Sequence, residues 1–227
     1  MRRYVFYGTL LLIACGLIQA APQPAIVQRP GQWTLETRFE QPQQLVLPYG
    51  VNGETRFWYM ILTVTNRTGQ DVDFRPRCEL MTNTFQIIPA GVGVPSVVFE
   101  KIKERHQSRY PLLEPLGKVE SRLVRSASKA KIEGAENLLL QGEDNARDIA
   151  VIWPDFDSKA TAFKIFVSGL SNEVAVVNHP TAIDPNDGKP IRVYLQKTLQ
   201  LDYTLRGDPA IKSAVELVYK GKSWIMR

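Results

Sequence analysis

The sequence contains few of the residues that enzymes use for nucleophilic, acid–base or metal chemistry. Of its 227 residues, two are cysteines and two are histidines, His106 and His179. A serine or cysteine nucleophile needs a neighbouring base, usually a histidine, and no Gly-x-Ser-x-Gly turn is present. Zinc sites require closely spaced histidine and cysteine ligands, which the sequence also lacks. We therefore expect no catalytic residues, no metal site and no cofactor.

Long apolar runs are absent apart from one at the start of the chain. Arg2 and Arg3 precede an apolar stretch over residues 4–18, and the small residues Ala20 and Ala21 follow. This order is typical of an export signal that is removed from the mature protein. The sequence therefore predicts an exported protein, periplasmic or extracellular, with residues 1–20 as its signal peptide.

A second form of processing competes with cleavage after Ala20. Residues 12–15, Leu-Ile-Ala-Cys, resemble a bacterial lipobox, in which Cys15 would be lipidated and would anchor the protein to the cell envelope. The apolar run continues beyond Cys15, which favours the soluble product. Residues 21–31 contain three prolines and are predicted to form a leader or tether.

Loss of the signal leaves Cys78 as the one cysteine, so the mature domain contains no disulfide. Around it, Val72, Phe74, Pro76 and Leu80 alternate with charged residues. A period of two places Cys78 on the apolar face of a strand, where it acts as a small buried hydrophobe.

The same alternation recurs along the mature chain and predicts strands. Such segments lie at 33–39, 45–49, 57–64, 72–80, 149–153, 163–167, 174–177, 191–205, 215–219 and 224–226. Residues 57–64 are apolar on both faces, so this strand should be covered on both sides. Turn-forming residues at 66–71 predict a hairpin joining it to the Cys78 strand, and Lys220-Gly221-Lys222 predicts another turn.

The longest alternating segment, residues 191–205, is too long for one flat strand in a small domain. Lys197 interrupts its apolar positions and predicts a bend, a bulge or an edge at that point. An edge along this segment would be able to pair with a strand of a partner.

One segment departs from the strand pattern. Pro95 followed by Val98, Phe99 and Ile102 predicts a helix, and residues 118–130 predict a weaker one. We therefore expect one domain over residues 32–227 with a partly helical insertion at 96–136. Between residues 100 and 132 lie nine lysines or arginines and four glutamates, which account for the basic excess of the mature chain.

This basic segment is a candidate interaction surface. Its candidate contact residues are Lys101, Lys103, Arg105, Arg109, Arg122 and Arg125. Another envelope protein or an anionic envelope polymer would be a suitable partner. Nucleic acid is disfavoured because Tyr110 is the one aromatic residue nearby and because the protein is exported.

Two segments resemble exported bacterial immunoglobulin-like domains. Residues 138–143, Leu-Leu-Leu-Gln-Gly-Glu, precede the apolar strand 149–153, and residues 62–69 form a strand followed by an Asn turn. The resemblance implies a mainly β fold, an immunoglobulin-like antiparallel β-sandwich with a short partly helical insertion. The Cys-Trp-Cys core of antibody domains is missing, and the resemblance implies no functional residues.

Two clusters of acidic residues leave alternative functions open. Asp155 and Asp157, with Glu143 and His179, would serve an envelope hydrolase if the fold gathered them in one pocket. Asp184, Asn186 and Asp187 precede Gly188 and resemble part of a calcium loop, as in a calcium-stabilised adhesion domain. Loop acids and a tight turn explain both clusters more simply. Our first hypothesis is a non-catalytic exported envelope protein that binds or scaffolds a partner.

Overall fold

The structure is a computed structural model that describes residues 25–27, 29–48, 53–116, 137–208, 211 and 214–227. The predicted signal peptide, Cys15 and the second predicted helix lie outside the described residues, as do Arg122 and Arg125. The described chain is mainly β, and its sheets are antiparallel apart from one short parallel pair.

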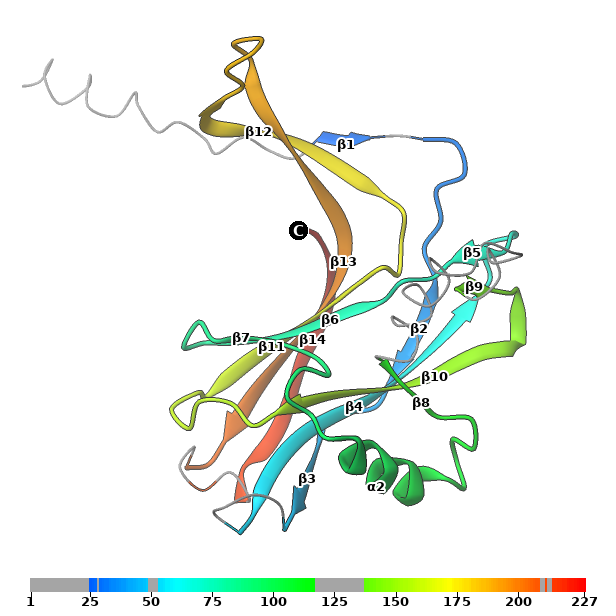
Figure 1. Ribbon diagram of the computed structural model, residues 1–227, viewed down its shortest axis with the longest axis vertical. Helices are drawn as coiled ribbons and strands as arrows, with labels where there is room; N and C mark the ends of the chain where they lie inside the picture. The colour runs from blue at the N-terminus through cyan, green and yellow to red at the C-terminus, as the bar shows by residue number, and fades with distance from the viewer. Residues whose placement is uncertain (1–24, 28, 49–52, 117–136, 209–210, 212–213) are drawn as a thin grey trace, which may run out of the picture.

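The larger sheet has seven strands in the order β1-β12-β13-β11-β6-β7, and β14 also pairs with β13 (Figure 1). These strands are β1 (Ala25–Val27), β6 (Arg77–Thr82), β7 (Ile87–Pro89), β11 (Ala162–Ser168), β12 (Val174–Ile183), β13 (Pro190–Arg206) and β14 (Glu216–Met226). The strand β1 lies within the segment that the sequence predicts to be a leader.

The smaller sheet has five strands in the order β2-β4-β10-β8, with β3 also beside β4. They are β2 (Glu36–Phe39), β3 (Gln43–Leu47), β4 (Thr55–Asn66), β8 (Glu114–Pro115) and β10 (Gly142–Pro154). A separate pair consists of β5 (Val72–Asp73) and β9 (Leu138–Leu139).

The two sheets face each other across a core to which both contribute. Trp58 of β4 packs against Phe156 and against Phe163 of β11, whose ring stacks on Tyr203 of β13. The predicted inward positions of the long strand are confirmed, since Leu199, Leu201 and Tyr203 are buried. The prediction for Cys78 is confirmed as well, because this residue is buried in the same core.

Both faces of β4 are covered, as its apolar sequence predicts. One face carries Trp58 and enters the core between the sheets, and the other carries Tyr59 and Ile61. The helix α2 (Ser96–His106) covers this second face with Val98 and Ile102. It begins directly after Pro95, so the predicted helical insertion is confirmed for its described part.

The predicted hairpin over residues 57–80 is wrong. β4 and β6 belong to different sheets, and the chain passes between them through the short strand β5. The turn itself forms, since Nδ2 of Asn66 donates hydrogen bonds to the carbonyl oxygens of Gln70 and Leu139. However, the two edges of β4 are already occupied by β10 and by β2 with β3, so the strand after the turn pairs elsewhere.

The turn predicted at Lys220-Gly221-Lys222 is also wrong. The structure has one continuous strand, β14, which pairs with β13 along its whole length. The register shifts between Asp202 and Tyr203, which lie opposite Gly221 and Tyr219, so Lys220 is the additional residue of a β-bulge. Glycine and two lysines therefore mark a bulge on an outer strand.

Candidate functional site

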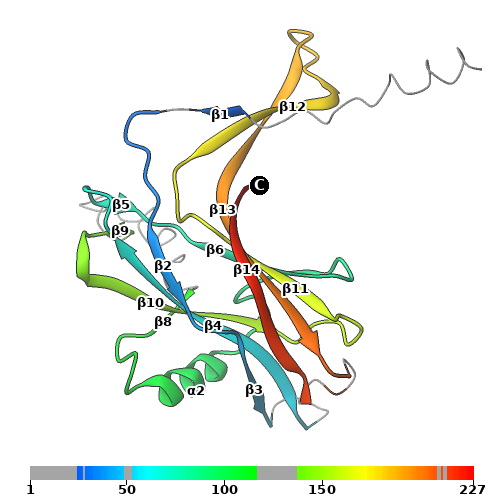
Figure 2. The same ribbon diagram turned by 180° about the vertical axis from the view of Figure 1, so that it is seen from behind.

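The strand β13 has two sets of partners along its length. Residues 190–196 pair with β12, whereas residues 197–206 pair with β14 and, over 199–204, with β11. As a result, β12 and the first half of β13 extend beyond the two packed sheets, with β1 on their outer side (Figures 1 and 2). We call the ribbon formed by Ala25–Val27 and residues 174–196 the arm.

Lys197 lies at the base of the arm, where the partners of β13 change. Its backbone N–H donates to the carbonyl of Glu173, and its Nζ lies 2.5 Å from Oε1 of that residue. The same Nζ donates to Oγ1 of Thr34 and lies over the ring of Trp224. This hydrogen bond from Lys197 lowers the pKa of Glu173. The bend or edge predicted at Lys197 is thus confirmed, and the ion pair fixes the arm to the body.

The arm carries apolar side chains on the face that continues the inner face of the larger sheet. By register, this face carries Ile26, Ala175, Val177, Ile191, Val193 and Leu195. None of these residues belongs to the core clusters of the described chain. Ile26 is 60% exposed and Ile191 is 43% exposed, and on the opposite face Tyr194 is 59% exposed. These exposed apolar groups on a projecting element make the arm a candidate contact surface.

One backbone edge of the arm is open as well. Gln196 exchanges two backbone hydrogen bonds with Arg227, and beyond this pair no described strand lies beside residues 190–195 on that edge. The sequence points to this long strand but does not show which half of it has a free edge.

Of the four described residues of the predicted basic surface, three contact other residues of the protein. Lys101 pairs with Glu104 at 2.8 Å, and Arg109 lies 2.6 Å from Oε1 of Glu40. Arg105 donates to the carbonyl oxygen of Gln44 and to the hydroxyl of Tyr59. Lys103 pairs with no carboxylate among the described residues.

Sequence analysis missed a polar network beneath these arginines. The hydroxyl of Tyr59 lies 2.8 Å from Oε1 of Gln43 and 3.0 Å from Nε2 of His106. Tyr110 donates to Glu40, and burial with this bond raises the pKa of Tyr110 to about 12. In the sequence, the helical spacing of His106 and Tyr110 was the one available signal of this polar network. His106 is half-buried because it contacts Tyr59 on the side of the helix that faces the sheet.

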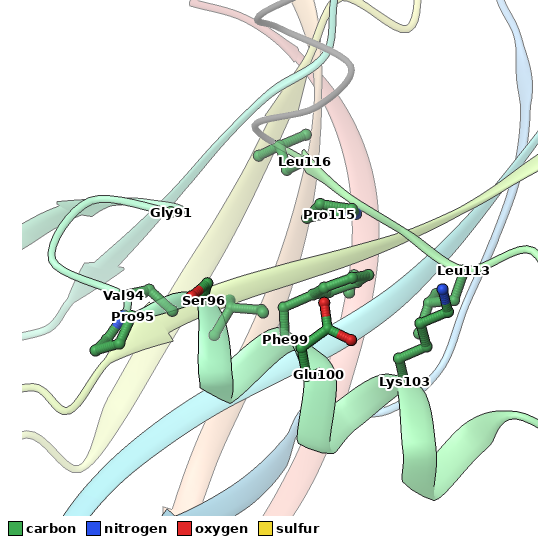
Figure 3. A pocket seen from close by; sticks show the side chains of 12 residues that line it. Gly91, Val94, Pro95, Ser96, Phe99, Glu100, Lys103, Leu113, Pro115 and Leu116 are labelled. Carbon is green, nitrogen blue, oxygen red and sulfur yellow. The ribbon is translucent and has the colours of Figure 1, made fainter. Parts of the chain in front are cut away.

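A groove of about 500 Å³ lies between the start of α2 and β10 (Figure 3). Figure 3 shows Phe99, Glu100 and Lys103 along its helix side and Leu113, Pro115 and Leu116 across from them. Ala150 and Ile152 of β10 also line it. Most residues that line the groove are apolar, and its helix side carries one charged group of each sign.

The structure does not gather Asp155, Asp157, Glu143 and His179 in one place. Asp155 accepts hydrogen bonds from the ring N–H of Trp58 and the backbone N–H of Phe156. Asp157 accepts the N–H of Lys159 in a turn. Glu143 pairs with Arg67 at the opposite end of β10, and His179 lies on the arm.

The predicted calcium loop forms the turn at the tip of the arm. Oδ1 of Asp184 accepts the backbone N–H of Asn186, and Oδ1 of Asp187 accepts that of Lys189. Lys189 also pairs with Asp187 at 3.4 Å. Within the described chain, no group of three or more histidine, cysteine or acidic side chains is placed to hold a metal ion.

Two further results bear on the whole chain. In the part that the structure describes, no helix is both long enough and apolar enough to cross a membrane. Comparison of the chain with protein-family models, curated proteins and solved structures returned no significant match.

Proposed function

We propose that this protein is a non-catalytic, exported protein of the cell envelope that binds or scaffolds a partner through the arm. The observation that supports this proposal most directly is the exposure of Ile26, Ile191 and Tyr194 on a ribbon outside the sandwich core. Beyond the three residues of β1 the arm is a two-stranded ribbon, and such a ribbon is only marginally stable by itself in water. A partner that covers its apolar face would both stabilise it and give it a function.

The proposal favours a protein partner over an anionic polymer. Lys101 and Arg109 form ion pairs with Glu104 and Glu40, so the described part of the basic helix surface offers less free positive charge than its sequence suggests. The arm offers apolar side chains and backbone hydrogen-bonding groups, which are what an extended or folded polypeptide recognises.

Export and fold family form part of the same proposal. We place the mature chain in the periplasm or outside the cell after cleavage following Ala20, with lipidation at Cys15 as the alternative. We also assign the sandwich to the immunoglobulin-like class. Two facing antiparallel sheets support this assignment at the level of architecture. Mass spectrometry of the mature N-terminus distinguishes the two forms of processing.

The binding function is tested by photo-crosslinking in intact cells of the source organism. p-Benzoylphenylalanine is introduced at Tyr194 on the arm or, as a matched control, at Phe85, an aromatic residue on the body that is 85% exposed. We expect position 194 to crosslink to a discrete envelope protein and position 85 to give no such product. Equal products from both positions, or none from position 194, would overturn the proposal.

A second variant removes the outer part of the arm and keeps its base and the body. Residues 178–192 are replaced by Asn-Gly, which joins Val177 to Val193, a directly opposed pair of β12 and β13. Asn-Gly is the preferred two-residue connection for such a pair. We expect the trimmed variant to lose the envelope protein that copurifies with the full chain. If the same protein copurifies with both, the outer part of the arm, residues 178–192, does not make the contact.

A further inference from the structure

We propose that the arm binds an extended segment of its partner by strand addition at the open edge of β13, residues 190–195. The added strand would be antiparallel to β13 and would continue the line of β14 beyond Arg227. This inference rests on the proposed function, because it specifies how the arm makes its contact and what kind of polypeptide segment it recognises.

The hydrogen-bonding pattern of β13 identifies the backbone groups that are available. Gln196 directs its N–H and C=O toward Arg227, so these groups point to the β14 edge. Because alternate residues of a strand point to opposite edges, Tyr194 and Arg192 present their N–H and C=O groups to the same edge. No described strand pairs with them there. A partner strand that continues the register of the Gln196–Arg227 pair would therefore lie opposite alternating backbone donors and acceptors of β13.

The outer edge of β14, the strand whose line the added strand would continue, is less suited to pairing. The outer edge of β14 carries Lys220, Lys222 and the bulge at Gly221, and Gln41 donates to the carbonyl of Leu217 on the same strand. Lysines and bulges are the usual means by which proteins protect an edge from strand addition. The free edge of β13 has no lysine between residues 190 and 196, and its pairing with β12 is regular from Arg192 to Gln196. Pro190 and Arg192 limit the open stretch to its middle residues, around Tyr194.

The side chains beside the open edge specify the partner segment. Val193 lies on the inner face with Trp224 and Met226 of β14 beyond it, so residues of the added strand on this face should be apolar. Arg192 and Tyr194 lie on the other face and are both exposed. A carboxylate opposite Arg192 gives a favourable cross-strand pair. The expected segment therefore alternates apolar with polar residues and includes an acidic residue.

A second copy of this chain fits the edge less well. If β13 of two copies paired antiparallel about a twofold axis, the available backbone groups would allow two registers. In the first, Arg192 lies opposite Arg192 of the other copy, and in the second, Arg192 lies opposite Tyr194. The first arrangement brings like charges together and relies on Pro190, which has no N–H. The second register places Pro190 of one copy opposite Gln196 of the other copy. The backbone groups of that Gln196 already bond to Arg227 of its own chain. A separate polypeptide segment is the occupant that avoids both conflicts.

The test uses a phage-displayed library of random octapeptides selected on the purified mature chain. We expect enriched peptides to alternate apolar and polar residues and to carry aspartate or glutamate. Tyr194→Pro removes an N–H that points away from β12, and Tyr194→Thr is its control because it keeps that N–H. We expect Tyr194→Pro to weaken peptide binding by about tenfold or more and Tyr194→Thr to weaken it by about threefold or less. Arg192→Glu should disfavour the acidic peptides.

Circular dichroism and thermal melting verify that each variant folds. Equal binding by Tyr194→Pro and the wild type overturns strand addition, and the binding function stands if crosslinking at position 194 persists. A dimer that forms with increasing concentration and is abolished by Tyr194→Pro would identify a second copy as the occupant and overturn the partner assigned here. Enrichment of no peptide also overturns it.

Discussion

Gly169 shows how strongly a single residue can be constrained by a neighbouring chain segment. Its φ angle is 80°, and a Cβ built on it would lie 2.0 Å from the carbonyl oxygen of Arg75. The loop between β11 and β12 therefore passes directly over the segment that leads into β6. Glycine is required here both by the backbone conformation and by the close approach of a second backbone.

We predict that Gly169→Ala destabilises the protein by more than about 2 kcal/mol, because backbone atoms must move to make room for the methyl group. The matched control is Gly188→Ala at the tip of the arm. Gly188 has a similar φ of 68°, but its added Cβ meets nothing within 4 Å. This control should cost about 1 kcal/mol. Urea denaturation measures the free energy of unfolding of both variants. Equal losses of stability would show that the close approach of Gly169 to the backbone of Arg75 is unimportant.

His106 gives the stability a specific pH dependence. Burial lowers its pKa, and the neighbouring Arg105 and Arg109 add to this effect, whereas Glu40 opposes it. The folded state therefore binds the proton less tightly than the unfolded state. The stabilisation is complete above the pKa of the unfolded state and is lost as the pH falls through that value toward the folded pKa.

We predict that stability decreases between about pH 7.5 and pH 5.5 in the wild type and decreases less in His106→Gln. Glutamine retains a polar atom near the hydroxyl of Tyr59 and does not titrate. Free energies of unfolding measured across this range provide the comparison. Parallel curves for the two proteins would exclude His106 as the titrating group.

At the scale of the elements, α2 is held to the smaller sheet by a few apolar side chains. Ile102 is fully buried and packs in the same cluster as Leu45, Phe57 and Tyr59. Its spacing from Val98 puts both residues on one face of the helix. The remaining faces carry charged residues, so removal of Ile102 weakens the attachment directly.

We predict that Ile102→Ala lowers the free energy of unfolding by about 2–5 kcal/mol, the usual cost of truncating a buried isoleucine. Val97→Ala on the same helix is the control, because Val97 is 43% exposed. It should change stability by about 0.5 kcal/mol or less. Chemical denaturation with a probe of helix content tests both. A small effect of Ile102→Ala would mean that the helix contributes little to the core.

At the scale of the whole molecule, the arm and the sandwich are expected to differ in their contribution to stability. The core clusters of the described chain draw on both sheets and on α2 but include no arm residue. The stabilising free energy of apolar burial therefore comes mainly from the body, and we expect the arm to belong to the part of the structure that unfolds most easily.

We predict that the trimmed variant, with residues 178–192 replaced by Asn-Gly, keeps the unfolding free energy of the body within about 1 kcal/mol. Lys197 and Glu173 remain, so the base of the arm stays intact. Thermal and urea unfolding are the measurements. A large loss of stability would indicate that the arm is an integral part of the sandwich, and the loss of binding by this variant would then have a structural explanation.

The amino-acid sequence by itself determined the local features of this protein. Alternation identified the inward face of the long strand, the burial of Cys78, the double coverage of β4 and the change of environment at Lys197. Helical spacing identified the described helix. These properties depend on the order of neighbouring side chains, and each segment carries that information without reference to the others.

Only the tertiary structure decided which strands pair and which backbone groups remain free. The turn at Asn66 did not lead to a hairpin because both edges of β4 were occupied, and Gly221 became a bulge because β14 stays beside β13. The network around His106 and the open edge at Tyr194 likewise depend on segments distant in sequence. A strand has the same alternating pattern whichever edge it joins, so pairing is decided by the competition among all strands for the available edges.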